Sequence, residues 1–128
     1  MYQPYINYEG YINMGGNTLT PENAEKYLIK ASRHIDILTF GRINKFKFEK
    51  LTEYQQDIIK EVCMNLSDFE YENDDVLSSI LSGYSINGVS ISFNQNNWNL
   101  ILQSGVAIKA DDYALLSQTG LTTASLYY

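Results

Sequence analysis

Two long amphipathic stretches constrain the fold more than any other feature of this sequence. The first opens with Thr20-Pro21-Glu22, a typical helix start. Threonine can cap, proline needs no N–H in the first turn, and glutamate favours the positive end of the helix dipole. Apolar residues then recur at helical spacing, at Ala24, Tyr27, Leu28, Ala31, Ile35 and Leu38. We therefore predict a helix over residues 20–39, ended by Thr39-Phe40-Gly41.

The second stretch begins with a capping box, in which Thr52 is followed three residues later by Gln55. Its apolar stripe comprises Tyr54, Ile58, Val62, Leu66 and Phe69, widened by Ile59 and Cys63. This pattern predicts a helix over residues 52–71, with Asn73 as a stop. Because the connector between the two helices is short, an antiparallel pair is the expected arrangement.

After the second helix the pattern changes to alternation. Tyr84-Ser85-Ile86 and Val89-Ser90-Ile91-Ser92-Phe93 flank Asn87-Gly88, which favours a hairpin over residues 82–93. A short helix is predicted over residues 110–118, with Gly120 as its stop. No pattern assigns residues 94–109. The sequence thus predicts one mainly α domain over residues 1–128, a small helical bundle with a long antiparallel helix pair, one β-hairpin and a short C-terminal helix.

The two ends of the chain are rich in tyrosine. Tyr2, Tyr5, Tyr8 and Tyr11 recur every third residue within an N-terminal arm, residues 1–19, and Gly15-Gly16 is interpreted as a flexible joint. The arm tyrosines either pack on the domain's own body or dock on a neighbouring subunit, since tyrosine combines apolar area with a hydroxyl. The C-terminal tail, residues 121–128, is apolar and aromatic, which is unusual for a free end.

Charge argues against a protein that grips phosphates. Fifteen acidic and nine basic residues give a net charge of −6, whereas nucleic-acid affinity comes mainly from clustered Lys and Arg. Residues 40–50 hold four of the basic residues interleaved with Phe40, Phe46 and Phe48. A nucleic-acid contact there stays an alternative, but we expect the phenylalanines to pin this connector to the helices while the lysines stay in water.

No catalytic, cofactor or metal site is expected. His34 and Cys63, the single histidine and the single cysteine, lie on different predicted helices, and Cys63 falls on an apolar face where a thiol behaves as a small hydrophobe. Asp74-Asp75 and Asp111-Asp112 lack the alternating spacing of a calcium loop, and Asp111-Asp112 suits a helix start. No apolar run approaches the roughly 20 residues that span a bilayer, so we expect a soluble protein made in the cytoplasm.

Four segments resemble, in their order along the chain, the head–tail connector family (head-completion or adaptor proteins) of long-tailed bacteriophages and prophages. They are Ala31–Thr39 with Arg42-Ile43, Leu51–Gln55 leading into Ile58–Cys63, the hairpin segment Gly83–Ser90, and Tyr113–Leu121. The family commonly has a basic residue soon after the Thr-Gly-Leu triplet. Here Thr122-Thr123-Ala124 follows, so no charge contact is carried over at that point.

The resemblance implies a mainly helical structural subunit, not an enzyme, that forms a ring of about twelve copies beneath the portal protein. Such a ring would meet a stopper or other joining protein, place the chain in the virion at the head–tail junction after assembly in the host cytoplasm, and let DNA pass without specific binding. A monomer in isolation is compatible with this. We expect the partner contacts at the hairpin tip and the two ends of the chain, namely Asn87, Gly88, Leu121, Leu126, Tyr127, Tyr128, Tyr2 and Tyr5. The alternative is a small soluble helical adaptor that binds a protein unrelated to virions.

Overall fold

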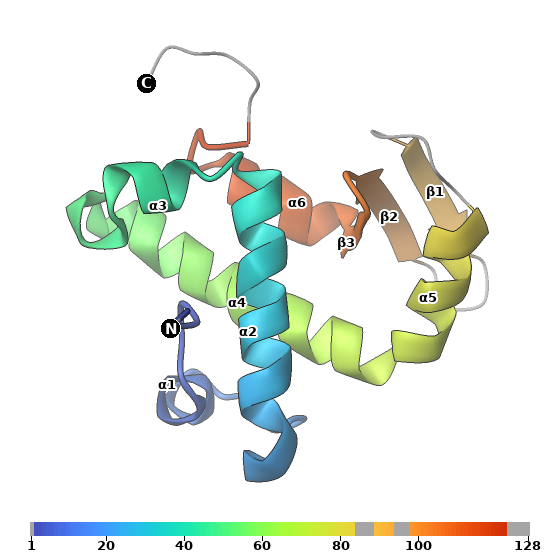
Figure 1. Cartoon of the computed structure of the whole chain (residues 1–128), viewed down its shortest axis with the longest axis horizontal. Helices are drawn as coiled ribbons and strands as arrows, with labels where there is room; N and C mark the ends of the chain where they lie inside the picture. The colour runs from blue at the N-terminus through green and yellow to red at the C-terminus, as the bar shows by residue number, and fades with distance from the viewer. Residues whose placement is uncertain (1, 84–88, 94–97, 123–128) are drawn as a thin grey trace.

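A computed structural model of the chain shows a mainly helical body with a small sheet at one end (Figure 1). The structure describes residues 2–83, 89–93 and 98–122. Within them the helices are α1 (Tyr8–Asn13), α2 (Pro21–Leu38), α3 (Arg42–Phe46), the 3-10 turn η1 (Phe48–Lys50), α4 (Glu53–Glu72), α5 (Asp74–Gly83) and α6 (Ala110–Ser117). The strands are β1 (Val89–Phe93), β2 (Trp98–Gln103) and β3 (Val106–Lys109).

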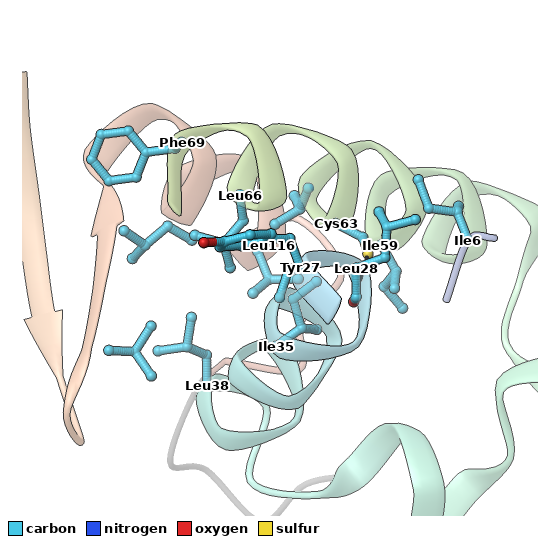
Figure 2. Close-up of a cluster of buried hydrophobic side chains, with 14 of the residues drawn as sticks. Ile6, Tyr27, Leu28, Ile35, Leu38, Ile59, Cys63, Leu66, Phe69 and Leu116 are labelled. Carbon is cyan, nitrogen blue, oxygen red and sulfur yellow. Dashed lines mark hydrogen bonds between the residues drawn. The ribbon is translucent and has the colours of Figure 1, made fainter. Parts of the chain in front are cut away.

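The two predicted long helices are confirmed as α2 and α4, which pack against each other and cross at a steep angle (Figure 1). Every residue of the predicted α2 stripe is buried, and so is every residue of the α4 stripe except Tyr54, which is 59% exposed. Tyr54 lies in the first turn of α4, before the helix meets α2, so the prediction of a buried Tyr54 is wrong. Figure 2 shows Leu28 and Ile35 of α2 and Ile59, Cys63 and Leu66 of α4 in one cluster.

Both helices start at their predicted N-cap residues, Thr20 and Thr52. The Gln55 N–H donates to Thr52 Oγ1 at 3.1 Å, and the Thr52 N–H donates to Gln55 Oε1 at 3.0 Å, which completes the capping box at α4. At α2 the Thr20 N–H donates to Asn23 Oδ1 at 2.9 Å. Asn73 caps the C-terminal end of α4, as predicted, and α5 follows at once.

The connector between α2 and α4 is more ordered than a loop. Phe40 and Gly41 both have positive φ, and the Gly41 N–H donates to the Asp36 carbonyl at 2.9 Å, which ends α2 in a Schellman turn. Phe46 and Phe48 pack against the core as expected, but Phe40 is 52% exposed. The αL backbone of Phe40 directs its side chain away from the core, which is why the packing prediction is wrong for that residue.

The sheet is larger than predicted. It has three strands in the order β1-β2-β3, both pairs antiparallel. The predicted strand Val89–Phe93 exists as β1, but it pairs with β2, while the proposed turn and partner strand at residues 84–88 lie outside the described residues. Residues 82 and 83 of the predicted hairpin end α5 instead. Ser104 and Gly105, both with positive φ, form the two-residue turn between β2 and β3.

The last predicted helix is confirmed as α6, with Asp111 and Asp112 in its first turn. Leu116 is fully buried, and Tyr113 and Leu115 pack against the core as expected. Helix α6 contacts α4, β2 and β3, so it joins the helix pair to the sheet. Among the described residues no helix combines the length and the apolar character that crossing a membrane requires.

The N-terminal residues belong to the body, because α1 packs against α2 and Tyr11 is fully buried. Tyr11 Oη donates to Asp68 Oδ1 at 2.6 Å and accepts the N–H groups of Thr18 and Leu19. Gly16 lies directly on the Tyr11 ring, where a Cβ atom would come within 2.4 Å of a ring carbon. The interpretation of Gly15-Gly16 as a flexible joint is therefore wrong at Gly16, which is a site of close packing.

Candidate partner-binding surfaces

The last described residues, up to Thr122, are held by contacts with α3 and α4. Arg42, at the start of α3, is only 8% exposed, and its Nη1 donates to the Leu121 carbonyl at 3.2 Å. Leu121 itself is 1% exposed and belongs to the core cluster. The side chain that the sequence placed in a partner contact therefore packs within its own subunit, and residues 123–128 follow a fixed point.

Residues in the first turn of α4 form hydrogen bonds with the residues that precede Leu121. Tyr54 Oη donates to Gln118 Oε1 at 2.6 Å, and Gln55 Nε2 donates to the Thr119 carbonyl at 2.9 Å. Thr119 is buried, and its hydroxyl donates to the Leu116 carbonyl at 2.7 Å. We call this cluster the C-terminal base, and it comprises Arg42, Tyr54, Gln55, Gln118, Thr119 and Leu121.

At the opposite end of the chain, residues 2–7 form an N-terminal strap across α2. The hydroxyl of Tyr2 donates to Asp36 Oδ2 at 2.7 Å, and the hydroxyl of Tyr5 donates to Asp36 Oδ1. The Arg33 guanidinium lies 3.8 Å from the centre of the Tyr2 ring, a cation–π contact. Burial, followed by the hydrogen bond to Asp36, raises the pKa of both phenols above the usual range, so both keep their protons at neutral pH.

The strap separates two grooves. One, of about 630 Å³, lies between the strap, α1 and the α4 residues Asp57, Lys60 and Glu61. The other, of about 430 Å³, lies between the strap and the α3–η1 segment, where Asn44 and Lys47 line it. Both grooves are lined by Gln3, Pro4 and Tyr5, so the strap is their common wall.

Beneath the strap lies the cysteine. Tyr5 N–H donates to Ser32 Oγ at 3.0 Å, Ser32 Oγ lies 3.3 Å from Cys63 Sγ, and Ile6 is buried beside them (Figure 2). Burial raises the pKa of the Cys63 thiol to about 11, against hydrogen bonds from Ser32 and the Ile6 backbone that lower it. This is the environment of a structural cysteine and not of an activated nucleophile.

His34 has a different partner. Its Nδ1 is hydrogen-bonded to Glu70 Oε2, which ties α2 to α4 through a carboxylate that is 3% exposed. The structure thus places His34 on Glu70 and Cys63 on Ser32, and it does not join them as a nucleophile and base. In the described part of the chain no three His, Cys, Asp or Glu side chains are grouped so that they could hold a metal ion.

The two aspartate pairs each begin a helix. Asp74 opens α5 and lies 3.5 Å from Lys30 Nζ. Asp112, in the first turn of α6, accepts from Asn65 Nδ2 at 3.2 Å. Each pair therefore has a structural explanation at its own helix start.

Of the eight predicted contact residues, the structure brings two together, because Tyr2 and Tyr5 meet on Asp36. Leu121 lies apart from them at the C-terminal base. The remaining predicted residues, Asn87, Gly88, Leu126, Tyr127 and Tyr128, lie outside the described residues. Sequence reasoning missed Asp36 and Arg42, although a charged residue beside an apolar stripe is the signal that could have singled them out.

Comparisons with protein-family models, with curated proteins and with solved structures found no match for this chain.

Proposed function

We propose that this protein is a structural ring subunit of the head–tail junction of a long-tailed phage or prophage, lying between the portal protein and a stopper or other joining protein. In this role the ring extends the DNA channel, and the chain performs no chemistry. Its net charge of −6 suits a channel that DNA passes without being held.

One observation carries the proposal. Three of the four segments that resemble head–tail connectors meet at the C-terminal base: Arg42 from the first, Gln55 from the second, and Thr119 with Leu121 from the fourth. Most of the remaining segment, at residues 83–90, lies outside the described residues. Resemblance that was scattered along the sequence is thus concentrated around Leu121, which directly precedes the apolar-aromatic end of the sequence. A connector needs such a fixed origin for a segment that docks on a larger platform.

The direct test is native mass spectrometry of this chain mixed with the portal protein encoded beside it. A complex that carries as many copies of this chain as the portal has subunits is the expected result. An intact portal that leaves a folded chain free would contradict the proposal and favour the alternative, a small adaptor for a protein unrelated to virions.

A truncated variant tests whether residues 123–128 are needed for portal docking. The variant ends at Thr122, because Leu121 is buried and its carbonyl is bound by Arg42. Removing residues 123–128 should abolish portal docking while the circular dichroism spectrum and the unfolding midpoint stay unchanged. A variant with Leu126, Tyr127 and Tyr128 changed to serine keeps the chain length and should fail in the same way. Docking by both variants would contradict the role of this segment.

A further inference from the structure

Charge is divided unevenly along the chain. Residues 20–51, which contain α2, α3 and η1, hold seven basic and four acidic residues. Residues 52–122, which contain α4, α5, the sheet and α6, hold two basic and ten acidic residues. The net charge of −6 is therefore the sum of a basic part and a strongly acidic part of the chain.

In the basic part of the chain, a row of basic and apolar residues follows one side of helix α2. Lys26, Lys30 and Arg33 follow one another at spacings of four and three along α2, Ile37 continues the same stripe, and Phe40 lies just beyond the end of the helix. Ile37 is 44% exposed and Phe40 is 52% exposed. By helical spacing this stripe is about half a turn from the buried residues of α2. Within the same chain, Lys30 lies 3.5 Å from Asp74 and the Arg33 guanidinium lies on the Tyr2 ring, while Lys26 is exposed. We call these five residues the α2 outer face.

In the acidic part of the chain, acidic residues are exposed on α4 and at the start of α6. Asp57 and Glu61 are exposed on α4, one turn apart, and Asp111 is exposed at the start of α6. Burial is the largest cause of the raised pKa of Asp112; the charges of Asp111 and Glu61 also raise it, whereas the Asn65 hydrogen bond and the charge of Lys109 lower it, so all three charged residues lie near this carboxyl. We call Asp57, Glu61 and Asp111 the acidic outer face. By helical spacing, Asp57 and Glu61 lie on the side of α4 away from its buried residues.

We propose that the α2 outer face of one copy binds the acidic outer face of the next copy. Two different, complementary surfaces on one chain make a heterologous contact, which closes into a ring when the rotation between neighbours allows it. The inference rests on the proposed function and specifies the ring contact. A second copy suits the α2 outer face better than DNA does, because Ile37 and Phe40 would gain nothing from a phosphate backbone and the same chain supplies the opposite charge.

The test uses charge reversal on each face. K26E/K30E makes the α2 outer face acidic, and D57K/E61K makes the acidic outer face basic. Each variant alone would bring like charges together, whereas a mixture of the two restores opposite charges at every contact in an alternating ring. We expect each variant to lower the self-association constant, measured by sedimentation at low salt, by about tenfold or more, and the equimolar mixture to recover it. Wild-type association should weaken as salt is added.

Two variants with the same charge changes away from these faces serve as controls. K45E/K50E matches the first variant and E9K/E49K matches the second, at positions that are all exposed. A third control, D74N, removes the ion pair that Lys30 makes within its own chain. All three controls should associate like the wild type. Circular dichroism and an unfolding midpoint for every variant confirm that the helix pair is intact.

The outcomes separate the two proposals. Rings that form on the portal from wild type and from both face variants alike would overturn the contact proposed here and leave the connector role standing. A wild-type chain that neither self-associates nor binds the portal would overturn both. Salt-sensitive DNA binding that K26E/K30E abolishes, with association unchanged, would overturn the contact and assign the α2 outer face to DNA.

Discussion

Tyr11 of α1 donates a hydrogen bond to Asp68 of α4 at 2.6 Å, across 57 residues of sequence. The same hydroxyl accepts the backbone N–H groups of Thr18 and Leu19 at 2.9 and 3.0 Å. A single phenol thus joins the N-terminal helix, the turn that leads into α2, and the C-terminal half of α4. The first twenty residues are held by this buried point and not only by surface contacts.

Tyr11→Phe should therefore destabilise the protein by about 2 kcal/mol, because the ring stays while a buried N–H and a partly buried carboxylate lose their partner. Urea unfolding followed by circular dichroism measures the change. Tyr8→Phe is the matched control, since Tyr8 stacks on Tyr11 and is only partly buried. Equal effects of the two substitutions would contradict the role given to the Tyr11 hydroxyl.

Gly16→Ala tests the packing on the other side of the same ring. The added Cβ atom would lie 2.4 Å from Tyr11, whose ring is fully buried and held by its hydroxyl, so it has no room to move. We expect a loss of about 2 kcal/mol in the free energy of unfolding. Asn17→Ala, at the exposed neighbouring position, should change it by less than about 0.5 kcal/mol. If Gly16→Ala left the free energy of unfolding unchanged, the turn around Gly16 would have to be able to shift.

The strap can be tested through the cysteine it covers. Asp36→Ala removes the acceptor of both Tyr2 and Tyr5, so the strap should open more often by local unfolding. The reaction of Cys63 with a disulfide reagent at pH 8 should then be about tenfold faster, while the global unfolding midpoint changes little. Asp75→Ala, on α5, should leave the rate unchanged. A rate unaffected by Asp36→Ala would show that other contacts close the strap.

The helices were predictable because their signals are local. The capping box at Thr52 and Gln55 and the apolar stripes of α2 and α4 depend on spacing within a few turns, and the structure has them as predicted. Residues 94–109 were not predictable because strand β2 pairs on both sides and the turn at Ser104 and Gly105 has no strong sequence signature. These residues become strands by hairpin pairing with neighbouring segments, Phe93 with Trp98 and Gln103 with Val106, which their own apolar pattern does not indicate.

The strap and the C-terminal base escaped sequence reasoning for a related reason. Asp36 and Arg42 read as solvent-facing charges next to the end of a helix. Their partners, Tyr2 and Tyr5 for one and the Leu121 carbonyl for the other, are 31 or more residues away. Such contacts follow from packing and not from periodicity. The tyrosine spacing did indicate an aromatic contact, and one of its two predicted interpretations, packing on the domain's own body, holds for Tyr2, Tyr5 and Tyr11.

Arg42→Ala should destabilise the protein by about 2 kcal/mol, because a buried guanidinium and its packing are lost and the Leu121 carbonyl loses a donor. Lys45→Ala removes a neighbouring positive charge that is exposed on the same helix, and it should have almost no effect. Thermal unfolding of the two variants side by side measures the difference. Similar midpoints would show that the C-terminal base does not depend on Arg42.

The pH dependence of stability should carry the signature of Asp112. Burial raises the pKa of this carboxyl, and the charges of Asp111 and Glu61 add to the effect. The folded state then binds its proton more tightly than the unfolded state, so stability is greatest below the unfolded pKa and falls as pH rises through the folded pKa.

Asp112→Asn keeps an acceptor for Asn65 and removes the cost of the buried charge. At pH 7 it should stabilise the protein by a few tenths of a kcal/mol, since water still screens the group, and at pH 3 this gain should vanish. Asp111→Asn, exposed in the same helix turn, loses its favourable position near the helix N-terminus without relieving burial, so it should be neutral or slightly destabilising. Urea unfolding at both pH values measures these differences, and a loss of stability at pH 7 for Asp112→Asn would mean that the helix dipole outweighs burial at this site.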